Sequence, residues 1–87
     1  MPNFEEIELL FSKLLAEAEL VLSDSELAEV HTFIDVGEYG LAVETAIDIY
    51  VEEKKTASAG AIALIEQLTV AMSMDAAPLL QRLRQRS

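Results

Sequence analysis

The chain contains no cysteine and no tryptophan, and only three glycines and two prolines among its 87 residues. Without cysteine it has no disulfide, no thiol nucleophile and no cysteine ligand for zinc or an iron–sulfur cluster. The glycines stand singly at Gly37, Gly40 and Gly60 and form no phosphate-binding loop. The sequence also lacks the Glu-x-x-His pair of di-metal bundles and the Asp-rich loop of calcium sites. We therefore expect neither a cofactor nor a metal ion.

Basic residues are also scarce. Six Lys and Arg stand against sixteen Asp and Glu, which gives a formal net charge of −10. Residues 1–53 hold fourteen of these acids and only one basic residue, Lys13, whereas residues 54–87 are net positive. Proteins bind phosphates through basic side chains, so the composition argues against a nucleic-acid partner. An acidic surface of this kind keeps a protein in solution, and it also attracts a basic partner.

Apolar residues, by contrast, are abundant at 52% of the chain, with a mean hydropathy of +0.28. This is enough to build a core, and 87 residues are too few for two cores, so we expect a single domain over 1–87. The most apolar stretch, Thr56 to Met74, includes Glu66 and several polar residues, which favours a buried helix over a membrane span. The first twelve residues lack Lys and Arg, so we expect a cytoplasmic protein without a secretory signal.

Apolar residues recur at helical spacing in five segments, and no alternating strand pattern or Asn-Gly turn interrupts them. Asn3 with Glu6, and Ser23 with Glu26, match the capping box that begins a helix. Gly37 suits the left-handed position that ends one. We therefore predict an all-α fold, a single compact bundle of four helices plus a short C-terminal fifth helix. The expected helices are about 4–22, 24–36 and 38–53, a fourth capped by Thr56 or Ser58, and a last one capped by Asp75.

The helical pattern also predicts which faces are buried. Helix one should pack through an apolar face that runs from Phe4 to Leu22, and helix two through a face that includes His31. The fourth helix is the most apolar and is expected to be the most buried. In the last helix, the leucines at 79, 80 and 83 should dock on the core.

Two patterns suggest chemistry only weakly. His31 and Asp35 lie four residues apart on a helix, as a base and its orienting carboxylate would, but no nucleophile accompanies them. Ser25, between Asp24 and Glu26, resembles the phosphopantetheine serine of acyl carrier proteins. However, Glu26 replaces the Leu that should follow this serine, and the long loop that precedes it in carriers is missing. Ser25 is more simply part of a helix cap, and we expect no enzymatic activity.

The twelve residues from Phe33 to Glu44, FIDVGEYGLAVE, resemble the signature of MafI-type immunity proteins. These small acidic helical proteins protect bacteria from their own secreted polymorphic toxins, many of which are nucleases. A looser similarity extends from Leu22 to Asp75. After the third helix the family tends to continue with an acidic, aromatic stretch, where this chain has Lys54 and Lys55 followed by Thr56 and Ala57. The resemblance implies a non-catalytic protein that binds and neutralises a cognate toxin domain, expected to be basic.

We expect this partner to bind the outer face of the third helix, where Glu44, Asp48 and Glu52 recur every four residues. Leu41 and Val51 place apolar groups among these carboxylates. Long-range attraction would then speed association, and desolvated apolar side chains would slow dissociation. The expected partner-binding residues are Asp35, Glu38, Leu41, Glu44, Asp48, Val51 and Glu52.

A function of another class stays open. A small acidic adaptor or structural module could self-associate, as a weak homodimer, through Leu9 and Leu20, which project from the first helix away from its core face. Neither hypothesis predicts a nucleic acid or a membrane as a partner.

Overall fold

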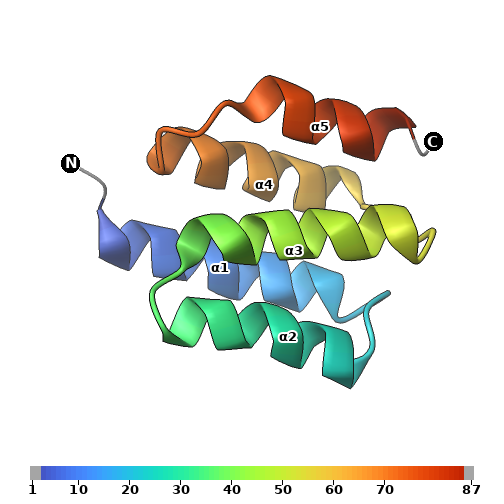
Figure 1. Ribbon diagram of the computed structural model, residues 1–87, viewed down its shortest axis with the longest axis horizontal. Coiled ribbons are helices and arrows are strands. Elements are labelled where there is room, and N and C mark those ends of the chain that lie inside the picture. Colours follow the sequence, from blue (N-terminus) through green and yellow to red (C-terminus); the bar gives the residue numbers. More distant parts are fainter. Residues whose placement is uncertain (1–2, 86–87) are drawn as a thin grey trace.

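The computed structural model describes residues 3–85, and it is all-α, as the sequence predicts. Within these residues there is no strand. The helices are α1 (Phe4–Ala18), α2 (Asp24–Asp35), α3 (Tyr39–Glu52), α4 (Ala59–Ala71) and α5 (Ala76–Gln85). Four helices and a shorter fifth therefore form the expected bundle (Figure 1).

The predicted helix starts are confirmed at the level of single hydrogen bonds. Ser23 Oγ accepts from the Glu26 amide while the Glu26 carboxylate accepts from the Ser23 amide, so the capping box is complete. At α1, the Asn3 side chain accepts from the Glu6 amide. Ser58, not Thr56, caps α4 by accepting from the Ala61 amide. Asp75 accepts from the Ala77 amide at the start of α5.

Three helices end in the same way, and only one of these ends contains glycine. Gly37 has φ +78°, and the amides of Gly37 and Glu38 donate to the carbonyls of Ile34 and Phe33. This is the Schellman arrangement, with a left-handed residue directly after the helix. Lys54 (φ 55°) and Ser73 (φ 57°) occupy the same position after α3 and α4. The prediction for Gly37 is confirmed, and the other two ends carry no glycine signal in the sequence.

The first helix is shorter than the apolar pattern predicts. It ends at Ala18 rather than about residue 22, and residues 19–22 form a turn in which the Leu22 amide donates to the Ala18 carbonyl at 2.7 Å. Leu22 is nevertheless buried, because the turn directs its side chain back into the core. The sequence pattern therefore predicted too long a helix, because Leu22 continues the apolar spacing but reaches the core from a turn.

The core draws buried side chains from all five helices, but the helices do not contact one another equally. The principal partner of α1 is α4, and that of α2 is α3, whereas α1 and α2 contact each other sparsely. The last helix, α5, packs on both α3 and α4, and Figure 1 shows it alongside α4. Its Leu80 and Leu83 are buried and Leu79 is partly buried, as predicted.

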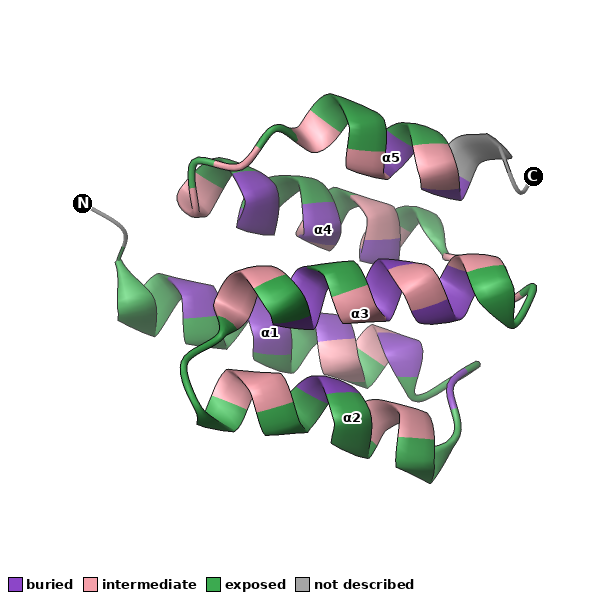
Figure 2. Ribbon diagram, viewed as in Figure 1, coloured by how far each residue is buried: buried purple, intermediate pink, exposed green. Residues whose placement is uncertain are grey.

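Three expectations about burial were wrong (Figure 2). The most buried helix is α3, with six buried residues against four in α4, because α3 lies between α2 and α5. Phe4 is 59% exposed, although its ring lies 5.9 Å from that of Tyr39. His31 is exposed, and Val30 is the buried residue of α2.

The apolar stretch between Thr56 and Met74 folds mainly as α4, a helix of 13 residues. Among the described residues, no helix combines the length and the apolar character that a membrane crossing requires.

Candidate functional site

The outer face of α3 carries most of the residues that the sequence nominates for partner binding. Leu41, Glu44 and Glu52 are exposed, with 45% of the Leu41 surface accessible to solvent. Val51 is only partly buried, but it packs against the core. It therefore has a structural role that Leu41 does not share.

Asp48, in the centre of this face, is already paired within the protein. Its Oδ1 accepts a hydrogen bond of 2.6 Å from the Arg82 guanidinium, which comes from α5. Both side chains remain partly exposed, so the pair lies at the surface. Asp48 is therefore less available to an external cation than Glu44 and Glu52, a distinction that the regular spacing of the three acids does not predict.

Asp35, the last residue of α2, and Glu38, the residue before α3, lie near the N-terminus of α3 on either side of the left-handed Gly37. Both are exposed. At 1.5 Å per residue, Glu38 and Glu52 are separated by about 20 Å along the helix axis. The predicted site residues thus form one long surface and do not converge on a pocket.

The turn between α2 and α3 is fastened to α1 through Tyr39. The Tyr39 hydroxyl donates a hydrogen bond of 2.7 Å to Glu8 Oε2, and this bond raises the pKa of Tyr39 above its ordinary value. The Tyr39 ring also lies 6.0 Å from the buried Phe11 ring. The segment 33–44 therefore has a fixed conformation relative to α1, which presents Asp35 and Glu38 in a defined geometry.

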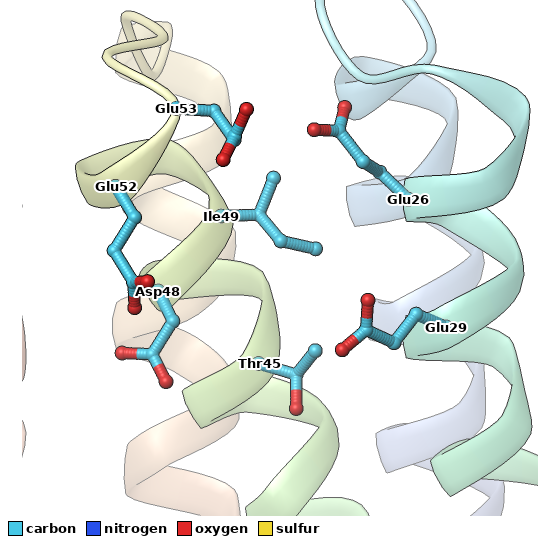
Figure 3. Close-up of a pocket in the computed structure, with 7 residues that line it drawn as sticks. All are labelled: Glu26, Glu29, Thr45, Asp48, Ile49, Glu52 and Glu53. Atoms are coloured by element: carbon cyan, nitrogen blue, oxygen red, sulfur yellow. The ribbon is translucent and has the colours of Figure 1, made fainter.

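A groove between α2 and α3 gathers carboxylates that the sequence analysis did not connect. It has a volume of about 420 Å³ and is open to solvent. Figure 3 shows Glu26 and Glu29 extending from α2 toward α3, with Thr45, Ile49 and Glu53 on the facing side. The residues that line it are Glu26, Glu29, Thr45, Asp48, Ile49, Glu52 and Glu53.

Two of the five groove carboxylates are neutralised from outside the groove. Asp48 pairs with Arg82, and Glu26 accepts a 2.6 Å hydrogen bond from Lys55 Nζ. The Lys55 hydrogen bond, aided by the Ser23 amide, holds the pKa of Glu26 below its ordinary value. Within residues 3–83, whose side chains are described, Glu29, Glu52 and Glu53 have no such pair. Among these described side chains, the groove therefore carries three carboxylates that form no ion pair.

The contribution of α2 was missed, although a signal for it exists. The connection between α2 and α3 is only three residues long, which makes the two helices antiparallel neighbours. The first turns of α2 must then lie beside the last turns of α3. This rule places Glu26 and Glu29 next to Glu52 and Glu53, without any knowledge of the other helices.

The residues considered for metal binding or catalysis do not come together in the described part of the chain. In the part of the chain that the structure describes, no three acidic or histidine side chains converge closely enough to hold a metal ion. His31 Nδ1 and Asp35 Oδ1 are 3.9 Å apart on the exposed side of α2, which is too long for a hydrogen bond. Ser25 is an exposed first-turn residue whose hydroxyl lies 3.3 Å from Ser23 Oγ.

Comparison with family models, with curated proteins and with solved structures finds no match to this chain. What distinguishes this chain is therefore its acidic surface and the resemblance of residues 33–44 to one family signature.

Proposed function

We propose that this protein is a cytoplasmic immunity protein that binds a cognate secreted toxin domain, most simply a basic nuclease domain, and neutralises it without catalysis. The observation that carries the proposal is the α2–α3 groove, where Glu29, Glu52 and Glu53 form no ion pair with any side chain that the structure describes. Like charges placed near one another on a surface repel and lower the stability of the fold. A basic partner supplies the compensation.

The surroundings of the groove suit a protein partner better than a small ligand. The groove is open to solvent, and α3 also carries the exposed side chains of Glu44 and Leu41. Separated carboxylates on a helical surface can accept hydrogen bonds from several Lys and Arg side chains at once. Leu41 adds an apolar contact that would lose its water on binding. Inhibition then follows either from carboxylates that take the place of substrate phosphates or from bulk beside the active site.

The segment 33–44 supports the same proposal. Its resemblance to MafI-type immunity proteins covers the turn at Gly37 and the first half of the acidic face. The bond between Tyr39 and Glu8 fixes this segment against α1, and a preorganised surface loses less entropy on binding.

Self-association is the second candidate function, and two exposed leucines favour it. Leu9 is 55% exposed on α1, and Leu20, in the turn after α1, is 80% exposed. A dimer through these residues would bury apolar surface that the monomer leaves in water. Light scattering of the purified protein, with Leu9→Gln as the variant, distinguishes a monomer from such a dimer.

The immunity proposal is tested with the gene immediately upstream. If it encodes a large secreted protein, its C-terminal domain is expressed alone and together with this chain. We expect the domain alone to stop growth and this chain to restore it. Glu29→Lys with Glu52→Lys should reduce the association rate at least about tenfold at low ionic strength and less at high salt.

The matched control is Glu5→Lys with Glu66→Lys, which makes the same change in charge at exposed positions on α1 and α4. This control should protect cells and bind normally. The proposal fails if the wild-type chain neither binds the upstream domain nor protects against it. Equal losses in the two double variants would instead show that net charge, and not the groove, governs binding.

A further inference from the structure

A second groove lies on the opposite side of α2, between α2 and α1. Its volume is about 300 Å³. It exists because α1 packs mainly on α4 and α2 mainly on α3, so the two helices contact each other only sparsely. No part of the predicted site other than Asp35 lines this groove.

The groove combines an apolar base with an acidic rim. Leu15 and Ile34 are partly exposed along it, and the buried Phe11 ring lies beneath them. Glu8 and Asp35 contribute carboxylates from the two walls. This is a different chemistry from the α2–α3 groove, where carboxylates dominate and Ile49 is the apolar residue.

Among the described residues, no Lys or Arg lines this groove; His31 does line it, with Nδ1 3.9 Å from Asp35 Oδ1. Lys13 is the single Lys or Arg in residues 1–53, and it follows Ser12, which does line the groove. At 100° per residue, Lys13 points about 140° away from Glu8 around α1. The acidic rim therefore faces no Lys or Arg side chain from its own two helices.

We infer that the α1–α2 groove is an anchor site for an apolar side chain of a basic protein segment. The apolar side chain would displace water from Leu15 and Ile34, and Lys or Arg residues beside it would meet Glu8 and Asp35. Such an anchor adds residence time to a complex whose formation is driven by long-range charge. The inference rests on the proposed function only in taking the partner to be basic.

The two grooves border the same helix from its two sides. Glu26 and Glu29 face α3, whereas Ile34 and Asp35 face α1. A partner that engages both grooves must therefore straddle α2. This helix buries only Val30 completely, so most of its surface is free for contact.

The absence of tryptophan from the chain allows a direct test. The probe is a short synthetic peptide of lysines around one tryptophan, whose emission shifts to the blue when the indole leaves water. We expect a saturable blue shift with the wild-type protein. A peptide with glutamates in place of the lysines should give none, because Glu8 and Asp35 would repel it.

The protein variant that tests the location is Ser12→Arg, which places a long cationic side chain in the groove from an exposed helical position. It should weaken peptide binding at least about tenfold, equivalent to 1.4 kcal/mol. Ala63→Arg makes the same change in charge on the exposed side of α4 and should bind as wild type. Circular dichroism verifies that both variants remain helical.

Two outcomes overturn the inference. One is equal binding by Ser12→Arg and wild type. The other is loss of the blue shift in Glu29→Lys with Glu52→Lys but not in Ser12→Arg, because that result would place the indole in the α2–α3 groove. Neither outcome depends on a toxin. The peptide can therefore fail to bind the α1–α2 groove although the chain neutralises a toxin, and it can bind there although the chain does not.

Discussion

Lys55 Nζ donates a hydrogen bond of 2.6 Å to the Glu26 carboxylate and one of 2.8 Å to the Val21 carbonyl. These bonds connect the segment after α3 to the region where α1 leads into α2. Lys55 follows α3, Glu26 is in the first turn of α2, and Val21 belongs to the turn after α1. One ammonium group therefore ties the segment after α3 to the start of α2 and to the turn before it. Lys55 is also where the chain departs from the acidic, aromatic stretch of the family that it resembles, and here the departure has a structural role.

This contact predicts a pH dependence of stability. The pKa of Glu26 is lowered from its ordinary value of 4.5 in the folded protein, mainly by Lys55. The stabilisation is therefore present above about pH 4.5 and is lost as pH falls through the lowered pKa. We expect Lys55→Met to melt at a lower temperature than wild type at pH 7, with a smaller difference below pH 4. A difference that is the same at both pH values would contradict the role of Glu26 ionisation.

At the left-handed helix ends, removing a glycine should destabilise the protein and introducing one should stabilise it. Gly37→Val should destabilise the protein by about 1 kcal/mol or more, because a β-branched residue is strained at positive φ. No atom lies within 4 Å of the added Cβ, so the cost is in the backbone. Lys54→Gly removes the same strain and should stabilise by up to about 1 kcal/mol.

Denaturant midpoints measure both changes. Gly40→Ala is the control, since Gly40 has no positive φ and its added Cβ would meet only Met74 Sδ, at 4.0 Å. It should alter stability by less than about 1 kcal/mol. Within the described residues, no neighbouring helix therefore approaches Gly40 closely enough to require a glycine there. A Gly37→Val midpoint equal to wild type would refute the argument from φ.

The acids of α3 should differ in their effect on folding. Asp48→Lys replaces an ion pair by repulsion from Arg82, and exposed pairs of this kind contribute about 0.2–1 kcal/mol. Glu44→Lys changes the same charge at an exposed position and should shift stability by less than about 0.5 kcal/mol. Thermal melts at low salt should separate the two variants. Identical melts would mean that the pair with Arg82 adds nothing in solution.

Leu41 should govern dissociation from the proposed partner. Leu41→Ala removes apolar contact and leaves the charges intact, so we expect a dissociation rate at least about fivefold higher with an unchanged association rate. Val70→Ala is the control, since Val70 is 70% exposed on α4. Surface plasmon resonance with the toxin domain measures both rates. A fall in association rate instead would show that Leu41 shapes the surface before contact.

Local features of the sequence predicted local structure well. The box of Ser23 and Glu26, the cap at Ser58 and the left-handed Gly37 each depend on residues within one or two turns, and all are present. The end of α1 was missed because Leu22 keeps the helical spacing although a turn delivers it to the core.

The site was only partly predictable for a related reason. Spacing along α3 identifies Glu44, Asp48 and Glu52 as one face, but it cannot reveal that Arg82, 34 residues away, pairs with Asp48. The groove between α1 and α2 could be predicted only from the packing of the whole bundle. It exists because each of these two helices packs mainly on a different helix.

The packing of α1 on α4 and of α2 on α3 also sets the order in which the helices can pack during synthesis. The hairpin of α2 and α3 can form as soon as residue 52 has left the ribosome, because its contacts are close in sequence. The apolar face of α1, with Ile7, Phe11 and Leu14, makes only sparse contacts with this hairpin and finds its main partner in α4, some forty residues later. Throughout that interval α1 is a nascent segment with its apolar face uncovered, which makes it the part of the chain most open to a chaperone.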